Sequence, residues 1–348
     1  KEKNGRMVSA RTCREFMEKF WKSTRKWLPG VIISLAAIAA ILYFVDLGRF
    51  LEALRSADYR FIAGVLVVGL EWLAVRAVAW RTILRKRASY KDVFLTMCEG
   101  YLLNNFLPFR LGEIGRAFLL GRKTGLGFLE VLPSVIIERV LDLAFAAAIL
   151  LSAVPFVVGA SSAGVIALVI GGIVIAGLVA LYLLARNQEW ALKVFEKISR
   201  RLPGLQQRGA GFIQPLFSGL SVLTDGWLFV KILLWMAFNW AVAVLQYFLL
   251  LRAFFPETQP AWALFGLGAV AFGNAIPSLP GAVGTFEGAM AGALTIVSGN
   301  ESTSLAAAVT AHLVNYLLTG VIGLVALSQE GETLMGIYRQ LKNRQEGK

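Results

Sequence analysis

Several ionisable side chains of this chain lie inside sequence that is hydrophobic enough to enter a membrane. Glu138 and Asp142 are one helical turn apart, with Arg139 beside them, in an otherwise apolar segment. Charged groups at membrane depth are costly, so they usually face an interior cavity and mark a substrate or proton pathway. Arginine can also hold a phosphate through two parallel hydrogen bonds. The segment therefore predicts an anion-binding or proton-carrying site. A self-neutralised cluster that only joins helices is the alternative.

A motif of the form Asn-x-x-Pro, followed by Gly and Glu, occurs twice and interrupts hydrophobic sequence each time. Its copies contain Asn105, Pro108, Gly112 and Glu113, and then Asn274, Pro277, Gly284 and Glu287. Twenty-five residues after each Glu, an apolar segment carries an ionisable residue: Glu138 in one case and His312 in the other. Broken, polar, duplicated elements of this kind form the binding sites of many transporters near the bilayer midplane. We therefore expect a duplicated binding element.

The first copy of the motif is the basic one. Arg110 and Arg116 flank Gly112 and Glu113, where a helix should begin. Free N–H groups at the start of a helix attract phosphate, so this copy predicts an anion site. Alternatively, Glu113 only caps the helix and the arginines extend to lipid headgroups. Arg76, near the end of another apolar segment, is interpreted as extending to the headgroups in the same way.

The second copy contains no Lys or Arg between Pro277 and Glu287. Its glycines allow tight backbone turns, and Glu287 is placed to cap the helix that follows. An anionic ligand should therefore prefer the first copy. Asn274 and His312 are the polar candidates near the second copy. Hydrogen bonds between helices are the alternative role for such side chains, and a proton-carrying role for the one histidine stays open.

The composition is that of a membrane protein. Of 348 residues, 57% are hydrophobic and 16% are charged, and several apolar runs reach the about 20 residues that span a bilayer. The net charge of +13 does not indicate nucleic-acid binding, because the basic residues flank the apolar runs. One histidine and two separated cysteines leave only a carboxylate-based metal site, and no nucleotide-binding motif is convincing. We expect neither a metal nor a cofactor.

Two kinds of apolar segment determine the predicted fold. Six segments are long enough to span a membrane: 28–45, 61–80, 130–157, 164–185, 229–251 and 303–327. Two further stretches, 92–122 and 261–297, are broken by Pro, Gly and Asn and are predicted to be re-entrant helical hairpins. The prediction is an all-α polytopic membrane protein, an inverted repeat with about six full spans plus two re-entrant helical hairpins.

Basic residues concentrate in alternate loops, which sets the predicted orientation. The predicted parts are a basic cytoplasmic or interfacial segment 1–27, membrane repeats 28–158 and 159–328, and a cytoplasmic tail 329–348. Both termini are expected in the cytoplasm. The expected location is the cell membrane, as a multi-pass protein of a bacterial inner membrane.

The two motif copies, together with Glu138-Arg139-x-x-Asp142, resemble the lysylphosphatidylglycerol synthase transmembrane-region family, also called the flippase-like family. The resemblance covers about residues 28–330 and departs at Ala282, where the family often has a second glycine. It implies movement of a charged phospholipid or a lipid-linked intermediate between leaflets. The aminoacylating members carry a large soluble transferase domain. We find no such segment in these 348 residues, so we expect a stand-alone member without synthase activity.

We therefore expect a lipid transporter or flippase, and not an enzyme, for an anionic phospholipid or a lipid-linked substrate such as a polyprenyl phosphate. The candidate substrate-binding residues are Asn105, Arg110, Glu113, Arg116, Glu138, Arg139, Asp142, Asn274, Glu287 and His312. The alternatives are an intramembrane headgroup or glycosyl transferase, with Glu138 or Asp142 as general base, and an accessory membrane scaffold. Membrane lipids with anionic headgroups are the expected partners, nucleic acid is not, and a homo-oligomer stays open.

Overall fold

The computed structural model describes residues 46–107, 110–158, 221–276 and 278–330, together with single residues between 169 and 190. The predicted span 28–45, most of the span 164–185, the segment 1–27 and residues 331–348 lie outside the described residues.

The described ranges form helices and contain no strand. The helices are α2 (Leu47–Ser56), α3 (Tyr59–Ile83), α4 (Tyr90–Phe106), α5 (Leu111–Thr124), α6 (Phe128–Val158), η2 (Ser221–Thr224), α10 (Gly226–Phe254), α11 (Pro260–Gly273), η3 (Pro280–Ala282), α12 (Thr285–Ser298) and α13 (Glu301–Glu330). Among them, α3, α6, α10 and α13 are long and apolar enough to cross a membrane. They confirm four of the predicted spans, at 61–80, 130–157, 229–251 and 303–327.

Polar side chains fix where the spanning helices begin. The carboxylate of Asp58 accepts a hydrogen bond from a backbone N–H of the first turn of α3 at 3.0 Å, and that of Asp225 does the same for α10 at 3.2 Å. Asn300 caps α13 in the same way at 3.0 Å. Such caps satisfy N–H groups that the helix itself leaves without a partner. Three of the four spanning helices therefore begin directly after a capping side chain.

Two pairs of short helices form helical hairpins. Hairpin one consists of α4 and α5, and hairpin two consists of α11, η3 and α12; in each, the two longer helices pack on each other. Their bounds agree within a few residues with the predicted broken stretches 92–122 and 261–297. In both hairpins the duplicated motif lies at the connection between the helices, where the backbone leaves the helical conformation.

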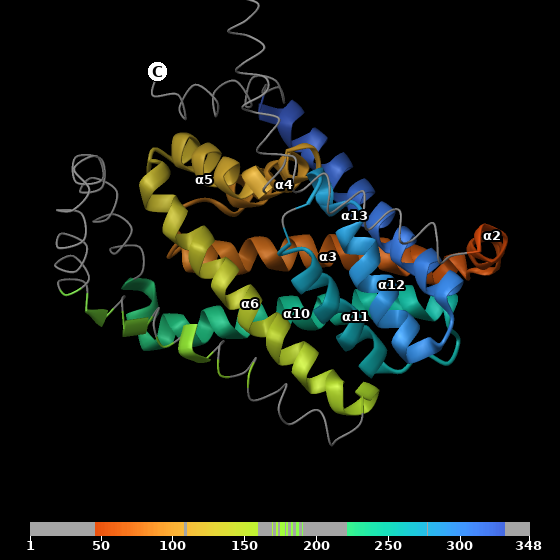
Figure 1. Cartoon of the computed structure of the whole chain (residues 1–348). Helices are drawn as coiled ribbons and strands as arrows, with labels where there is room; N and C mark the ends of the chain where they lie inside the picture. Colours follow the sequence, from red (N-terminus) through yellow and green to blue (C-terminus); the bar gives the residue numbers. More distant parts are fainter. Residues whose placement is uncertain are drawn as a thin grey trace, which may run out of the picture.

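The packing partners of helices α10–α13 repeat those of helices α3–α6. In hairpin one, α4 packs on α13 and α5 packs on α6, whereas in hairpin two α11 packs on α6 and α12 packs on α13. The long helices α3 and α10 lie side by side (Figure 1). Exchanging α3–α6 for α10–α13, in order, therefore leaves the set of packed pairs among these eight helices unchanged. This is the pattern that a duplicated four-helix unit would produce.

Two glycines let the helices of hairpin one approach closely. A Cβ atom added to Gly112 would overlap the carbonyl oxygen of Gly100 and would lie 2.6 Å from Oδ1 of Asn104. A Cβ atom added to Gly100 would lie 2.9 Å from Cβ of Arg116. Such distances are shorter than side chains tolerate, so the motif glycine is required by backbone contact between α4 and α5.

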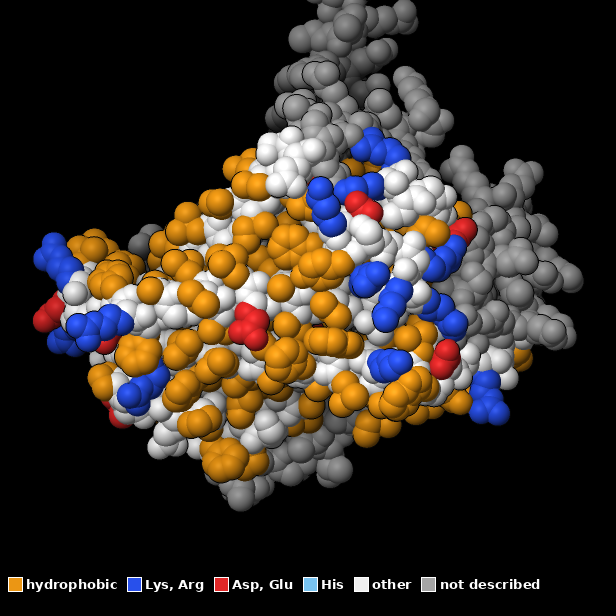
Figure 2. Space-filling model, turned by 180° about the vertical axis from the view of Figure 1, so that it is seen from behind, with side chains coloured by type: hydrophobic (Ala, Val, Ile, Leu, Met, Phe, Trp, Pro, Cys, Tyr) orange, Lys and Arg blue, Asp and Glu red, His pale blue; other side chains and the backbone are white. Residues whose placement is uncertain are grey.

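The surface is apolar where lipid would cover it. Figure 2 shows one face on which hydrophobic side chains cover the middle, Lys and Arg gather toward the sides, and one acidic patch lies within the hydrophobic area. Large apolar side chains such as Val67 of α3 and Leu234 of α10 are exposed. Together with the four spanning helices, this surface is that of an all-α, multi-pass membrane protein.

Candidate functional site

A cavity of about 620 Å³, open to one side, brings both copies of the motif together. Helices α3, α4, α6, α10 and α13 contribute to its wall. The connection of hairpin one supplies Leu107 and Arg110, and that of hairpin two supplies Asn274, Ser278 and Leu279. The cavity is within the size range of small-molecule sites, about 300 to 1,000 Å³.

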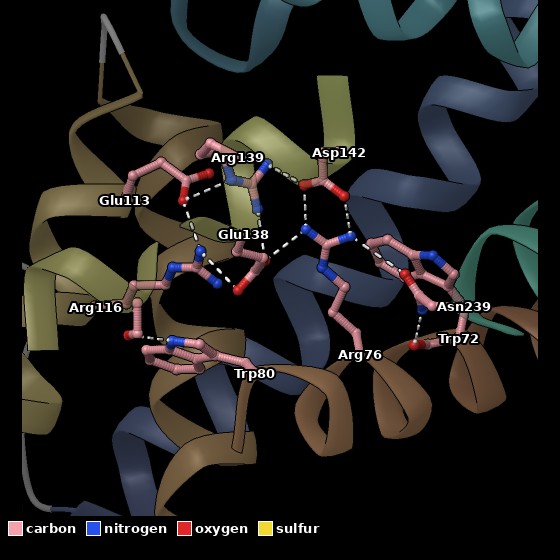
Figure 3. Close-up of polar contacts among 10 residues, drawn as sticks. Trp72, Arg76, Trp80, Glu113, Arg116, Glu138, Arg139, Asp142 and Asn239 are labelled. Carbon is pink, nitrogen blue, oxygen red and sulfur yellow. Dashed lines mark hydrogen bonds and ion pairs between the residues drawn. The ribbon is translucent and has the colours of Figure 1, made fainter. Parts of the chain in front are cut away.

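Glu138 is the centre of a buried charge network beside this cavity (Figure 3). Its side chain is 1% exposed. Its Oε1 accepts hydrogen bonds from Arg76 Nη2 at 2.5 Å and from Arg139 Nη2 at 2.9 Å. Its Oε2 lies 3.1 Å from Arg116 Nη2. Three guanidinium groups therefore converge on one carboxylate, which compensates the cost of burying its charge.

Arg76 joins three helices through this network. Its Nη1 donates to Asp142 of α6 at 2.8 Å and to Asn239 of α10 at 3.2 Å, and its Nη2 bonds Asp142 as well. Asn239 in turn donates to the carbonyl oxygen of Trp72 at 3.1 Å. Arg76 is 3% exposed and lines the cavity, so its interpretation as a residue that reaches the headgroups is wrong. Because α3 continues to Ile83, Arg76 lies about two turns inside the end of the helix.

Arg116 lies behind the cavity wall. Its guanidinium is 3.1 Å from Glu113 as well as from Glu138, and it lies 4.6 Å from the ring centroid of Trp80. Trp80 donates its own N–H to the hydroxyl of Ser134 at 2.9 Å. Arg116 is thus fixed by two carboxylates and an aromatic face, and it is not part of the cavity lining.

Arg139 and Arg110 are the arginines of the predicted set that line the cavity. Arg139 is 31% exposed, and its guanidinium lies 3.4 Å from Glu113 and 3.2 Å from Asp142. Arg110 precedes α5 with a φ of 52° and is exposed. Within the described ranges it makes no ion pair.

The charges of the network sum to zero, and Arg110 is a further positive charge outside it. Its members are three arginines (Arg76, Arg116 and Arg139) and three carboxylates (Glu113, Glu138 and Asp142). The network holds α3, α5 and α6 together, so the joining role anticipated as an alternative is present. Arg110 then gives the cavity wall one net positive charge. Trp240 also lines the cavity, and in the described part of the chain its indole N–H has no hydrogen-bond acceptor.

Hairpin two is held by a carboxylate–imidazole pair. Oε2 of Glu287 accepts a hydrogen bond from the N–H of Gly284 at 2.8 Å, which confirms that Glu287 caps α12. Its Oε1 lies 2.6 Å from Nδ1 of His312, whose Nε2 lies 2.9 Å from the carbonyl oxygen of Gly281. The 25-residue spacing noted in the sequence therefore separates two side chains in direct contact.

The predicted site residues fall into two groups. Seven line the cavity: Asn105, Arg110, Glu113, Arg139, Asp142, Asn274 and His312. Three lie behind its wall and support it: Arg116, Glu138 and Glu287. Asn105 also donates to the hydroxyl of Thr319 at 3.0 Å, which ties hairpin one to α13. Within the described ranges, no three His, Cys, Asp or Glu side chains are grouped so that they could hold a metal ion.

The chain is similar to proteins known as membrane proteins. The family described as "Lysylphosphatidylglycerol synthase TM region" matches residues 27–323. Two proteins of Methanothermobacter thermautotrophicus, each named "UPF0104 membrane protein", are 24% identical to the chain. The first alignment covers 84% of this chain and 90% of the relative, and the second covers 87% and 95%. A UPF0104 membrane protein of Methanocaldococcus jannaschii is 27% identical over 33% of this chain and 35% of its own length. No solved structure matches significantly. The chain belongs to the family described as the lysylphosphatidylglycerol synthase TM region.

Proposed function

We propose that this protein moves a lipid with an anionic headgroup between the two leaflets of the cell membrane. The substrate is a phospholipid or a lipid-linked intermediate. The observation that carries the proposal is the cavity, which is lined by both hairpin connections and bears one arginine beyond those of the charge-balanced network. The family description names a lipid-modifying enzyme, which agrees with a lipid substrate.

In this proposal the two hairpins are re-entrant, and α3–α6 and α10–α13 are inverted repeats. The repeated packing pattern supports a duplication, and the alternation of basic loops supports opposite orientations with both termini in the cytoplasm. Movement of one repeat against the other would then open the cavity to each side in turn.

The cavity wall suits a phosphate group. Arg110 and Arg139 present guanidinium groups on it. Charge-assisted hydrogen bonds from arginine to phosphate are among the stronger ones in proteins. The headgroup would lie against these donors while the acyl or prenyl chain stays among apolar side chains.

Transport accounts for the carboxylates better than group transfer does. A general base needs a free lone pair and access to the substrate. Glu138 is 1% exposed and engaged by three arginines, and Asp142 is engaged by Arg76 and Arg139. Their role in the proposal is to hold the arginines in place.

The test is lipid movement in proteoliposomes. Purified full-length protein is reconstituted with fluorescent lipids that carry an anionic headgroup, and the rate of transbilayer movement is measured by quenching from one side. Wild type should exceed empty vesicles. Arg110→Ala should reduce the rate about tenfold, because one charge-assisted hydrogen bond is lost. The matched control is Arg55→Ala, which removes an exposed arginine of α2 and should change nothing. Wild type at the level of empty vesicles would refute transport, and an unaffected Arg110→Ala variant would refute the anion site.

A further inference from the structure

We propose that Glu287 and His312 form a proton-binding site at hairpin two and that lipid movement is coupled to its proton. The coupling rests on the function proposed above, whereas the proton site depends only on the geometry of the pair. The ligand of the site is a single proton shared by an imidazole nitrogen and a carboxylate oxygen.

The hydrogen-bond partners of the imidazole fix its proton count. Nε2 of His312 lies 2.9 Å from the carbonyl oxygen of Gly281. A peptide carbonyl can only accept, so Nε2 must carry a hydrogen. In a neutral ring Nδ1 would then be an acceptor, facing Oε1 of Glu287 at 2.6 Å. An ionised carboxylate is also only an acceptor.

Two acceptors at that separation repel each other unless a proton lies between them. The pair therefore holds one proton more than a neutral imidazole and a carboxylate would. The proton is carried either as imidazolium beside carboxylate or as imidazole beside carboxylic acid. Both descriptions place the same proton between Nδ1 and Oε1.

Neighbouring groups hold the side chains of Glu287 and His312 in place. The side chains of His312 and Glu287 are 6% and 15% exposed. The ring of Phe286 stacks on the imidazole at a centroid distance of 4.3 Å. The cap from Glu287 to the N–H of Gly284 holds the carboxylate in place. His312, Phe286 and Gly281 line the cavity, so the proton lies at the wall that the lipid would contact.

Loss of the proton would act on the hairpin connection. The imidazole holds this connection through the carbonyl of Gly281, a residue with a φ of 71°. Ala282 and Gly284 follow with φ of 62° and 87°. A left-handed backbone at consecutive positions is favoured only when its surroundings hold it. Without the proton, Nδ1 and the carboxylate of Glu287 would repel each other, and the contact that keeps the imidazole against Gly281 would be lost. Protonation of the pair and the position of hairpin two should therefore be linked.

Few other ionisable groups of the described part of the chain face the pair. Tyr316 of α13 lies closest, with its ring centroid 4.7 Å from that of the imidazole, and Tyr247 of α10 lines the same cavity. Helix α11 and η3 carry no ionisable side chain. On α2, the side chains that carry charge are exposed: Arg49, Glu52 and Arg55. From α3, Arg76 is engaged in the network and Glu71 is exposed, and α4 meets α13 through Asn105 and Thr319.

The first test uses the fact that the chain has one histidine. Full-length protein labelled with ¹⁵N only in histidine gives a single pair of ring-nitrogen signals, whose positions report which nitrogen is protonated. Nε2 should carry a hydrogen, and Nδ1 should give the intermediate position of a nitrogen that shares a proton with a carboxylate. An unprotonated Nε2, or an Nδ1 signal at the position of a free acceptor nitrogen, would overturn the proton site.

Glu287→Gln is the matching variant. An amide can donate to a neutral Nδ1 and can still accept from the N–H of Gly284, so hairpin two keeps its contacts without the extra proton. The ring of His312 should then be neutral, with its hydrogen on Nε2, at a pH where the wild-type ring shares the additional proton. Unchanged ring signals in this variant would contradict the shared proton.

The second test measures coupling in the proteoliposomes described above. A gradient of about one pH unit should change the ratio of lipid between leaflets by up to about tenfold, if one proton accompanies each lipid. Glu287→Gln should move lipid equally with and without the gradient, and the control Glu52→Gln, at an exposed residue of α2, should behave like wild type. Wild-type movement that ignores the gradient refutes the coupling and leaves transport standing. No movement in wild type refutes the transport function, while the nitrogen signals still decide the proton site.

Discussion

The charge network makes a quantitative prediction about the pair Arg116 and Glu138. Their side chains are 2% and 1% exposed, and the nearest nitrogen and oxygen are 3.1 Å apart. Coulomb's law at this distance gives about 5 kcal/mol for an effective dielectric constant of about 20. Removing one partner of such a pair leaves a buried charge without compensation, which typically costs about 3 to 5 kcal/mol.

A double-mutant cycle separates charge balance from loss of contacts. Glu138→Gln leaves three arginines against two carboxylates, and Arg116→Met leaves two arginines against three. The double variant restores equal numbers, and methionine can still lie on the face of Trp80. We expect each single variant to lose about 3 to 5 kcal/mol of unfolding free energy, and the double variant to lose about 1 to 3 kcal/mol less than the sum.

The assay is thermal unfolding of the purified full chain in detergent, followed by circular dichroism. Glu52→Gln is the control, because Glu52 of α2 is exposed and makes no ion pair in the described ranges, so its unfolding midpoint should stay at the wild-type value. Losses that simply add in the double variant would refute the view of the cluster as one charge-balanced unit.

Three further substitutions, two of them paired with a control substitution in α12, test the hairpins and their contact with α13 by the same unfolding assay. Ala282→Gly should raise the unfolding free energy by about 1 kcal/mol, since Ala282 has a φ of 62°. Its control, Ala291→Gly inside α12, should lower the unfolding free energy by about as much. Changes in unfolding free energy of the same sign in the two variants would contradict this. Gly112→Ala should lower stability by about 1 to 3 kcal/mol or more, because its Cβ would overlap the carbonyl oxygen of Gly100. Its control, Gly292→Ala, should be neutral or favourable, because the added Cβ meets no atom within 4 Å. A Gly112→Ala variant as stable as wild type would show that α4 and α5 can separate. Thr319→Val should cost only about 0.6 kcal/mol, as interhelical hydrogen bonds in membranes do, and a loss beyond about 2 kcal/mol would point to a larger role for its bond with Asn105.

The sequence predicted the elements of the site better than their arrangement. Hydrophobic length identified the four described spans, and the breaks at Pro, Gly and Asn identified both hairpins. The spacing of Glu138, Arg139 and Asp142 correctly marked one charged stripe of α6. These features depend on local periodicity, which a single sequence displays.

Arg76 shows where sequence reasoning failed and what could have corrected it. A basic residue near the end of a span is usually assigned to the headgroups. Arg81, however, lies five residues nearer that end, so Arg76 is about 7.5 Å deeper in the helix. Depth alone was therefore a signal, but its partners come from α6 and α10, which no spacing along α3 reveals.

The division between lining and supporting residues also depends on tertiary contacts. Arg110 and Arg116 look equivalent on either side of Glu113, yet Arg110 lines the cavity and Arg116 stacks behind it on Trp80. The sequence marked Glu287 and His312 as equally spaced counterparts of Glu113 and Glu138. Their direct contact requires the stacking of α12 on α13, which only the fold provides.

The glycine contact between α4 and α5 has a mechanical consequence. Backbone packed on backbone leaves no side chain that can change rotamer, so hairpin one should move only as a rigid piece, and Arg116 ties it to α6. The connection of hairpin two is held by hydrogen bonds to the imidazole of His312, the hydroxyl of Tyr316 and the carboxylate of Glu287. Its helices also approach closely, because a Cβ atom added to Gly273 of α11 would lie 2.5 Å from Cβ of Ala289 of α12. If the two halves alternate, hairpin one should move together with α6 as one rigid body.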